Sequence, residues 1–137
     1  MARFLLDTCA IIWTGSGNSL SADAEGAINT AHENGDKVSA SPFSAWELGL
    51  LVARNRLPLP LPPDVWFNTY LDRSGVILAD LSVDTFVASS FLPDTPPNDP
   101  ADRIIIATAR AHGMTIVTRD KKILDYAQKG HVMAIAC

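Results

Sequence analysis

Four acidic side chains have the types and positions needed to bind a metal ion. Asp7 directly follows a short apolar run, and Asp120 comes two residues after a run rich in β-branched residues. Glu47 lies in an apolar stretch with helical character, and Asp102 lies near the start of another helical stretch. Carboxylate oxygens without His or Cys partners favour Mg²⁺ or Mn²⁺ over zinc. If the fold gathers these four acids, the chemistry they predict is metal-dependent hydrolysis of a phosphodiester.

Three of the four acids also have a purely structural explanation. Asp7 and Asp120 each precede a predicted helix, and Asp is a favoured N-cap residue. Asp102 is the third residue of a helix that Asp99 caps and Pro100 opens, a position where the helix dipole favours an acid. Asp99 is accounted for by its capping role and carries less functional weight. Each of these explanations is as good as the functional one when the residue is considered alone.

Glu47 is harder to explain by local structure. Its helical neighbours three and four positions away include no basic residue, so no partner lies on its own face. A carboxylate on an apolar helix is rarely buried without compensation. The alternatives are a long-range ion pair, an exposed position, or a bound cation.

Predicted strands and helices alternate along the chain, as judged from apolar runs, capping residues and turn residues. Strands are predicted over residues 4–6, 37–40, 76–79, 114–118 and 132–135. Helices are predicted over residues 9–13, 21–33, 42–55, 64–73, 82–91, 101–112 and 120–128, with Ser21 and Asp120 as caps. The proline-rich segment 57–63 is expected to be an extended connector.

This alternation predicts an α/β fold, a three-layer α/β/α domain with a mainly parallel central sheet. Ligands of such sheets bind beyond the carboxyl ends of the strands, so Asp7 and Asp120 are expected at the same edge. Helix 42–55 has few polar positions and is expected to be mostly buried. Trp13, Trp46 and Trp66 are expected in the core or in an interface. A length of 137 residues suits one domain spanning residues 1–137.

Composition narrows the functional classes. The net charge of −4 argues at first against nucleic-acid binding. Setting the four candidate ligands aside leaves 11 of the 15 acidic side chains, which balances the 11 Lys and Arg. Cys9 and Cys137 lack the spacing of a zinc site, and we expect no disulfide. No secretion leader, membrane span, serine-hydrolase elbow or phosphate-binding glycine loop is recognised, so a cytoplasmic protein is expected.

Four segments together resemble the PIN-domain family and, more narrowly, the VapC-type toxin ribonucleases of VapBC toxin-antitoxin systems. They are residues 4–8 (FLLDT), 44–48 (SAWEL), 99–109 (DPADRIIIATA) and 115–120 (TIVTRD), in the family's order and across nearly the whole chain. One such segment would be weak, whereas four in register are fairly specific.

The resemblance implies a PIN-like fold and an endoribonuclease that uses Mg²⁺ (or Mn²⁺) and a metal-activated water to hydrolyse RNA. Residues Asp7, Glu47, Asp102 and Asp120 match the family's acidic quartet, and Asp99 remains the alternative to Asp102. Thr8 and Thr118 fit the polar positions beside these acids. Near the proposed site, Arg103, Arg119, Lys121 and Lys122 are candidates for contacts to RNA phosphates, although a solvated helix start explains the lysines equally well.

The resemblance also implies partners. A VapB-type antitoxin and a second copy of the chain are expected to bind, with DNA contacted only indirectly through the antitoxin. Exposed apolar faces of the helix containing Trp13 and of helix 42–55 are candidates for these contacts. Two other functions stay open: a non-cleaving PIN-fold module that binds RNA or protein, and a PIN nuclease of RNA processing.

Overall fold

The computed structural model describes residues 2–137, which form a five-stranded parallel sheet. The strands are β1 (Arg3–Leu6), β2 (Lys37–Ala40), β3 (Ile77–Leu78), β4 (Thr115–Thr118) and β5 (Met133–Ala136). Their order across the sheet is β3-β2-β1-β4-β5, and every neighbouring pair is parallel. The predicted parallel sheet is therefore confirmed, although β3 is only two residues long where four were expected.

Helices connect the strands at the predicted places. They are α1 (Thr8–Gly15), α2 (Ala22–Glu33), α3 (Pro42–Ala53), α4 (Pro63–Ser74), α5 (Val83–Ala88), α6 (Pro100–His112) and α7 (Lys121–Gln128). Ser21 caps α2 by accepting from the backbone nitrogen of Ala24, as its sequence position indicates. Gly113 ends α6 with a φ of 63°, a left-handed conformation that costs glycine little. No helix within residues 2–137 has both the length and the apolar character that crossing a membrane requires.

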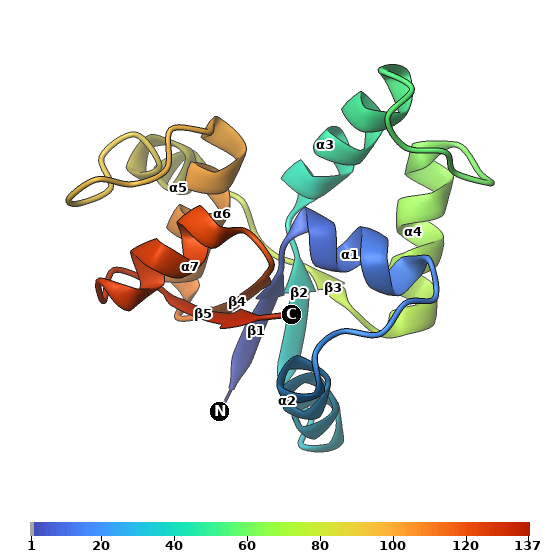
Figure 1. Ribbon diagram of the computed structural model, residues 1–137, viewed down its shortest axis with the longest axis horizontal. Helices are drawn as coiled ribbons and strands as arrows, with labels where there is room; N and C mark the ends of the chain where they lie inside the picture. The colour runs from blue at the N-terminus through green and yellow to red at the C-terminus, as the bar shows by residue number, and fades with distance from the viewer. Residues whose placement is uncertain (1) are drawn as a thin grey trace.

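The helices cover both faces of the sheet, as Figure 1 shows. Side chains alternate along β1, so Phe4 and Leu6 pack with residues of α1 to α4 on one face. Leu5 points to the other face and packs with residues of α6 and α7. The predicted three-layer α/β/α arrangement is confirmed, and its crossovers bring the carboxyl ends of β1 and β4 side by side.

Helix α3 departs from the prediction that it is mostly buried. Only Ser44 and Leu48 are buried, and Trp46 is 58% exposed. The helix rises away from the sheet in Figure 1, so only one of its sides meets neighbouring elements. An apolar sequence does not specify how many sides of a helix find a partner within one chain. Of the three tryptophans, only Trp66 is in the core, while Trp13 is 37% exposed.

Candidate metal site at the carboxyl edge of the sheet

Asp7 and Asp120 are connected through Thr118 where two neighbouring strands end. The backbone of Asp7 donates to the carbonyl of Val117 at 3.1 Å, which extends the pairing of β1 with β4. The buried Thr118 hydroxyl donates to Oδ2 of Asp7 and accepts from the backbone nitrogen of Asp120 at 3.0 Å. Thr118 therefore fixes one carboxylate and the start of the loop that carries the other.

Both aspartates also cap helices, as their positions in the sequence indicated. Oδ1 of Asp7 accepts from the backbone nitrogens of Cys9 (2.6 Å) and Ala10 (3.4 Å). Oδ1 of Asp120 accepts from the backbone of Lys122 at 2.8 Å and of Ile123 at 3.3 Å. In each case a single oxygen makes the cap. Within residues 2–137, no hydrogen bond involves Oδ2 of Asp120, so capping leaves that oxygen available to a ligand.

Glu47 reaches the same edge from α3 and is held by Thr8. The Thr8 hydroxyl lies 2.6 Å from Oε1 of Glu47, to which it donates, and 2.9 Å from Oγ of Ser44. Thr8 and Ser44 are both buried, whereas Glu47 is half-buried. Since Thr8 follows Asp7 in the chain, this contact joins the glutamate to the first aspartate. Ser44 was not predicted as a site residue, although its place one helical turn before Glu47 is a signal that could have singled it out.

Asp102 and Asp99 differ in exposure. Asp99 is exposed, and its Oδ1 caps α6 by accepting from the backbone nitrogen of Ala101 at 2.8 Å. Asp102 is half-buried, and burial together with the charges of the nearby acids raises its pKa to about 7. The acids responsible are Asp120, Asp99, Glu47 and Asp7, in decreasing order of effect. The four predicted ligands therefore share one electrostatic environment with Asp99 beside them.

Asp7 and Glu47, like Asp102, have raised pKa values and no basic partner. Burial raises the pKa of Asp7, and the charge of Asp120 adds to this, while hydrogen bonds led by that from Thr118 act in the opposite direction. Burial likewise raises the pKa of Glu47, against the hydrogen bond from Thr8. Burial and the surrounding carboxylates raise the pKa of the Cys9 thiol to about 11. No Lys or Arg is among the causes for Asp7, Glu47 or Asp102, so no basic side chain offsets their repulsion.

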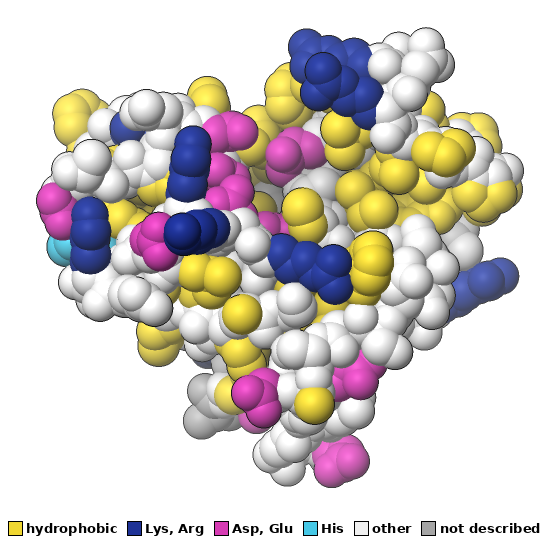
Figure 2. Space-filling view, viewed as in Figure 1, with side chains coloured by type: hydrophobic (Ala, Val, Ile, Leu, Met, Phe, Trp, Pro, Cys, Tyr) yellow, Lys and Arg dark blue, Asp and Glu magenta, His cyan; other side chains and the backbone are white. Residues whose placement is uncertain are grey.

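A divalent ion fits this environment by charge and by donor chemistry. Figure 2 shows Asp and Glu side chains gathered in an indentation between α6–α7 and α1–α3. Within residues 2–137, however, no three Asp, Glu, His or Cys side chains form a ready-made metal-binding group. Mg²⁺ usually keeps several waters and is bound through one or two carboxylates, so it does not need such a group. The oxygen-only donor set suits Mg²⁺ or Mn²⁺.

The four basic candidates, which lie close to Asp102 or Asp120 in the chain, have different settings. Arg103 is half-buried, and its Nε donates to the carbonyl of Pro97 at 2.7 Å, which ties the loop before α6 to that helix. Arg119 is exposed beside Trp13, and Lys121 and Lys122 are exposed in the first turn of α7. The hydrogen bond to Pro97 engages the Nε of Arg103, whereas the side chains of Arg119, Lys121 and Lys122 are accessible from solvent.

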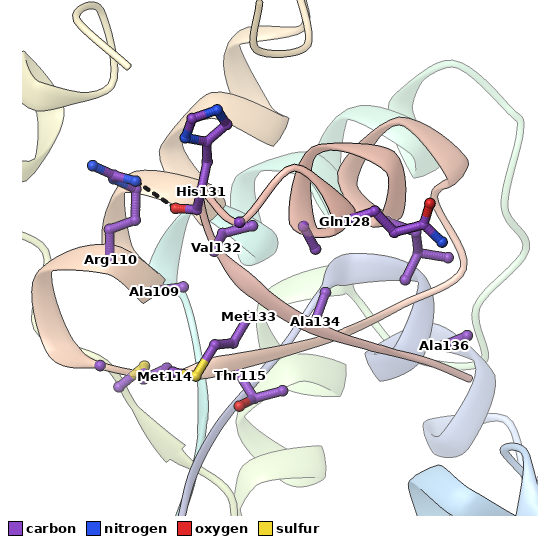
Figure 3. A pocket seen from close by; sticks show the side chains of 14 residues that line it. Ala109, Arg110, Met114, Thr115, Gln128, His131, Val132, Met133, Ala134 and Ala136 are labelled. Carbon is purple, nitrogen blue, oxygen red and sulfur yellow. Dashed lines mark hydrogen bonds between the residues drawn. The ribbon is translucent and has the colours of Figure 1, made fainter. Parts of the chain in front are cut away.

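A cavity of about 850 Å³ lies elsewhere, along β5, α7 and the end of α6 (Figure 3). Its lining includes Arg110, His131 and Met133, and the Arg110 guanidinium donates to the carbonyl of His131. None of the four candidate ligands lines it. The chemistry expected of the acids therefore belongs to the indentation in Figure 2 and not to this cavity.

A parallel α/β/α fold with acids beyond the ends of its central strands defines the class: an α/β protein with an acidic carboxyl edge, the edge where ligands of such sheets bind. More narrowly, residues 4–129 match the PIN domain, and the chain belongs to the PIN-domain family. The chain is 32% identical over 124 residues to Ribonuclease VapC22 of Mycobacterium tuberculosis (strain ATCC 25618 / H37Rv). That alignment covers 90% of this chain and 91% of the relative. The resemblance predicted from the four segments is confirmed.

Solved structures share the fold. A chain of VapBC2 from Rickettsia felis, bound to a DNA fragment from its promoter, superposes with a TM-score of 0.71 at 15% identity over 98% of both chains. FitAcB from Neisseria gonorrhoeae gives a TM-score of 0.57 at 22% identity over 96% of both chains. FitAB bound to an IR36 DNA fragment gives 0.56 at 21% identity, covering 97% of this chain and 94% of that one. At these identities the likeness supports the architecture alone.

Proposed function

We propose that this chain is a Mg²⁺- or Mn²⁺-dependent endoribonuclease that acts as the toxin of a toxin-antitoxin pair. The observation that carries the proposal is the hydroxyl-linked arrangement of its acids. Thr118 connects Asp7 to Asp120, and Thr8, next in the chain to Asp7, holds Glu47. The similarity to a protein named as a ribonuclease over 90% of the chain supports the reaction class.

Asp7, Glu47, Asp102 and Asp120 are the residues that would hold the ion. When bound, a divalent ion supplies positive charge to the scissile phosphate and to the leaving oxygen. Thr118 and Thr8 restrict the rotation of the Asp7 and Glu47 carboxylates through their hydrogen bonds. With a pKa of about 7, the Asp102 carboxyl holds a proton for part of the time at neutral pH, and an approaching positive charge favours its release.

The basic side chains near the acids would contact the RNA backbone. Lys121 and Lys122 lie in the first turn of α7, where the helix dipole disfavours cations. Both side chains are exposed there, so they are free to attract phosphates of an RNA strand. Arg119 lies just before them in the chain, and the part of Arg103 not engaged with Pro97 is a further candidate.

The antitoxin and a second copy of the chain are the proposed protein partners. Trp46 is 58% exposed on α3 and packs on Phe43, with ring centroids 5.0 Å apart. We assign this apolar side of α3 to a VapB-type antitoxin, because such side chains are favoured where protein surfaces meet. The solved VapBC2 and FitAB structures contain DNA fragments, and we expect DNA to reach this chain only through the antitoxin. An RNA substrate implies a cytoplasmic location.

A homodimer is assigned to a second apolar surface. On and just after α5, Val83, Phe86, Val87 and Phe91 are 77%, 44%, 55% and 79% exposed. A monomer would leave these side chains in water, and a second copy could cover them through the same patch. A sedimentation measurement showing a monomer at high concentration would contradict this assignment.

The proposed activity is tested by RNA cleavage with purified wild-type protein and Asp7→Asn, with and without Mg²⁺ or Mn²⁺. We expect metal-dependent cleavage by the wild type and its loss in the variant. Equal cleavage by both proteins would remove the assignment. The alternative is a non-cleaving module, and calorimetry that detects no Mn²⁺ binding would support it.

A further inference from the structure

Arg119 precedes the acidic Asp120 in the chain yet forms no ion pair with it. Its Cζ lies 4.0 Å from the centroid of the Trp13 ring, and its Nε donates to the main-chain oxygen of Cys137 at 3.2 Å. Across residues 2–137, the ion pair that the structure contains is between His131 and Asp94. The guanidinium is thus supported at two points, by an aromatic face and by a main-chain oxygen of Cys137, and within residues 2–137 it forms no ion pair with an Asp or Glu side chain.

Both supports are themselves fixed. The indole nitrogen of Trp13 donates to the carbonyl of Ser19 at 2.6 Å, which restrains the ring. The backbone nitrogen of Cys137 donates to the carbonyl of Thr118 at 3.1 Å, which continues the pairing of β4 with β5. Thr118 is also the residue that holds Asp7. The position of the guanidinium is therefore built on the same strand end as the candidate metal site.

The two supports leave the outer part of the guanidinium to other ligands. The Arg119 side chain is exposed, and its guanidinium also lies close enough to the Cys137 thiol to oppose the rise in pKa that burial causes in that group, while Nη1 and Nη2 donate to no oxygen of residues 2–137. An arginine fork binds two oxygens of a phosphate at once, and holding it in place beforehand reduces the entropy lost on binding. We infer that Trp13 and Arg119 form a phosphate clamp that holds an RNA backbone phosphate neighbouring the one at the acids. This inference rests on the proposed function.

A polymer with regularly spaced phosphates fits this arrangement. Arg119 lies on one side of Asp120 in the chain, and Lys121 and Lys122 lie on the other. Cations on both sides of a candidate metal ligand can contact several phosphates of one strand, while the phosphate between them lies at the acids. Figure 2 shows Lys and Arg side chains on more than one side of the acidic indentation. A single carboxylate of a protein partner could also bind the Arg119 guanidinium, but it would not explain why cations lie on both sides of Asp120.

The test compares RNA binding by Arg119→Gln, Arg119→Lys, Trp13→Leu and Trp13→Phe. Arg73→Gln is the matched control, since Arg73 is an exposed arginine in the last turn of α4. Fluorescence anisotropy with a labelled single-stranded RNA, in low salt with EDTA, measures affinity without cleavage. Loss of one charge-assisted bidentate contact predicts about tenfold weaker binding for Arg119→Gln. Lysine should restore only part of it, because it lacks the planar fork.

The tryptophan variants separate the clamp from simple charge attraction. Trp13→Leu should weaken RNA binding as Arg119→Lys does, Trp13→Phe should largely retain it, and Arg73→Gln should change it less than about twofold. In cleavage assays with Mg²⁺, Arg119→Gln should raise KM with little change in kcat. Thermal melting of each variant identifies any that has lost its fold, and the conservative Arg119→Lys and Trp13→Phe variants decide the question in that event.

The outcomes distinguish this inference from the proposed nuclease. RNA affinity of Arg119→Gln equal to that of Arg73→Gln overturns the clamp, even if Asp7→Asn abolishes cleavage. Unchanged RNA affinity combined with weaker binding of the antitoxin reassigns Arg119 to a protein contact and also overturns it. If wild-type protein shows no metal-dependent cleavage while Arg119→Gln and Trp13→Leu still weaken RNA binding, the nuclease proposal fails and the clamp stands.

Discussion

The hydroxyl of Thr118 donates a hydrogen bond to the carboxylate of Asp7, across 111 positions of the chain. This bond joins the ends of β4 and β1, and the same hydroxyl oxygen accepts from the backbone of Asp120 at 3.0 Å. One buried side chain therefore sets the relation between two candidate metal ligands that come from opposite ends of the sequence.

Replacing Thr118 with Val keeps the shape of the side chain and removes the hydroxyl. Because outer-shell hydrogen bonds orient ligands, we expect Mn²⁺ affinity and RNA cleavage to fall by about 10- to 100-fold. The loss of a hydrogen bond to a charged group should also lower the free energy of unfolding by about 1.5–3 kcal/mol. Calorimetry, cleavage assays and urea unfolding measure these effects. Thr118→Ser is the control, and a Val variant that matches it in Mn²⁺ affinity would contradict the role.

Thr8 is predicted to matter more than Ser44 at the glutamate. Thr8→Val removes the 2.6 Å hydrogen bond to Glu47, whereas Ser44→Ala leaves that bond in place and removes only the 2.9 Å contact behind it. We expect about tenfold weaker Mn²⁺ binding for Thr8→Val and a smaller loss for Ser44→Ala. Recovery in Thr8→Ser would show that the hydroxyl is responsible. The reverse order of the two effects would be inconsistent with this account.

Asp102, rather than Asp99, is predicted to be the ligand on α6. Asp102→Asn should reduce Mn²⁺ affinity and cleavage by at least about tenfold, because it removes a half-buried charge from the acidic environment. Asp99→Asn should change both by less than about twofold, since Asn caps a helix as well as Asp does. Both variants replace one carboxylate oxygen with an amide nitrogen, and both positions lie at the start of α6. Each variant therefore serves as the control for the other. A larger loss in Asp99→Asn would exchange their roles.

Stability without metal is predicted to fall as pH rises from about 4 to about 7. The pKa of Asp102 is raised from its ordinary 3.8 to about 7 in the folded chain, so between these values the folded state binds more protons than the unfolded state. Raising the pH removes that proton and leaves a negative charge that is partly desolvated and repelled by Asp120. Melting temperatures measured in EDTA across this range should decrease, and Asp102→Asn should flatten the dependence. The same proton should make Mn²⁺ binding weaker below pH 7, as calorimetry at two pH values can show.

Position along strands could be predicted from the sequence, whereas contacts between helices could not. Asp7 and Asp120 end up at one edge because β1 and β4 are parallel, which the alternation of strands and helices already indicated. The contact between Thr8 and Glu47 depends on how α1 packs against α3, and nothing local specifies that packing. The same limit explains the wrong expectation for α3, since the apolar character of Trp46 does not reveal whether a neighbour covers it. Arg119 was identified as a basic residue near the acids, but its stacking on Trp13 became visible only in the fold.

Asp7 and Asp120 each begin a helix with one carboxylate oxygen, while the other oxygen of Asp7 accepts from Thr118 and that of Asp120 has no hydrogen bond within residues 2–137. These two residues are therefore needed both to start a helix and, as proposed, to bind the metal ion. A genetic selection for harmless versions of this chain should therefore yield two kinds of survivor there: intact proteins carrying Asn, which still starts the helix, and apolar replacements that fail to accumulate in the cell because the helix start is lost.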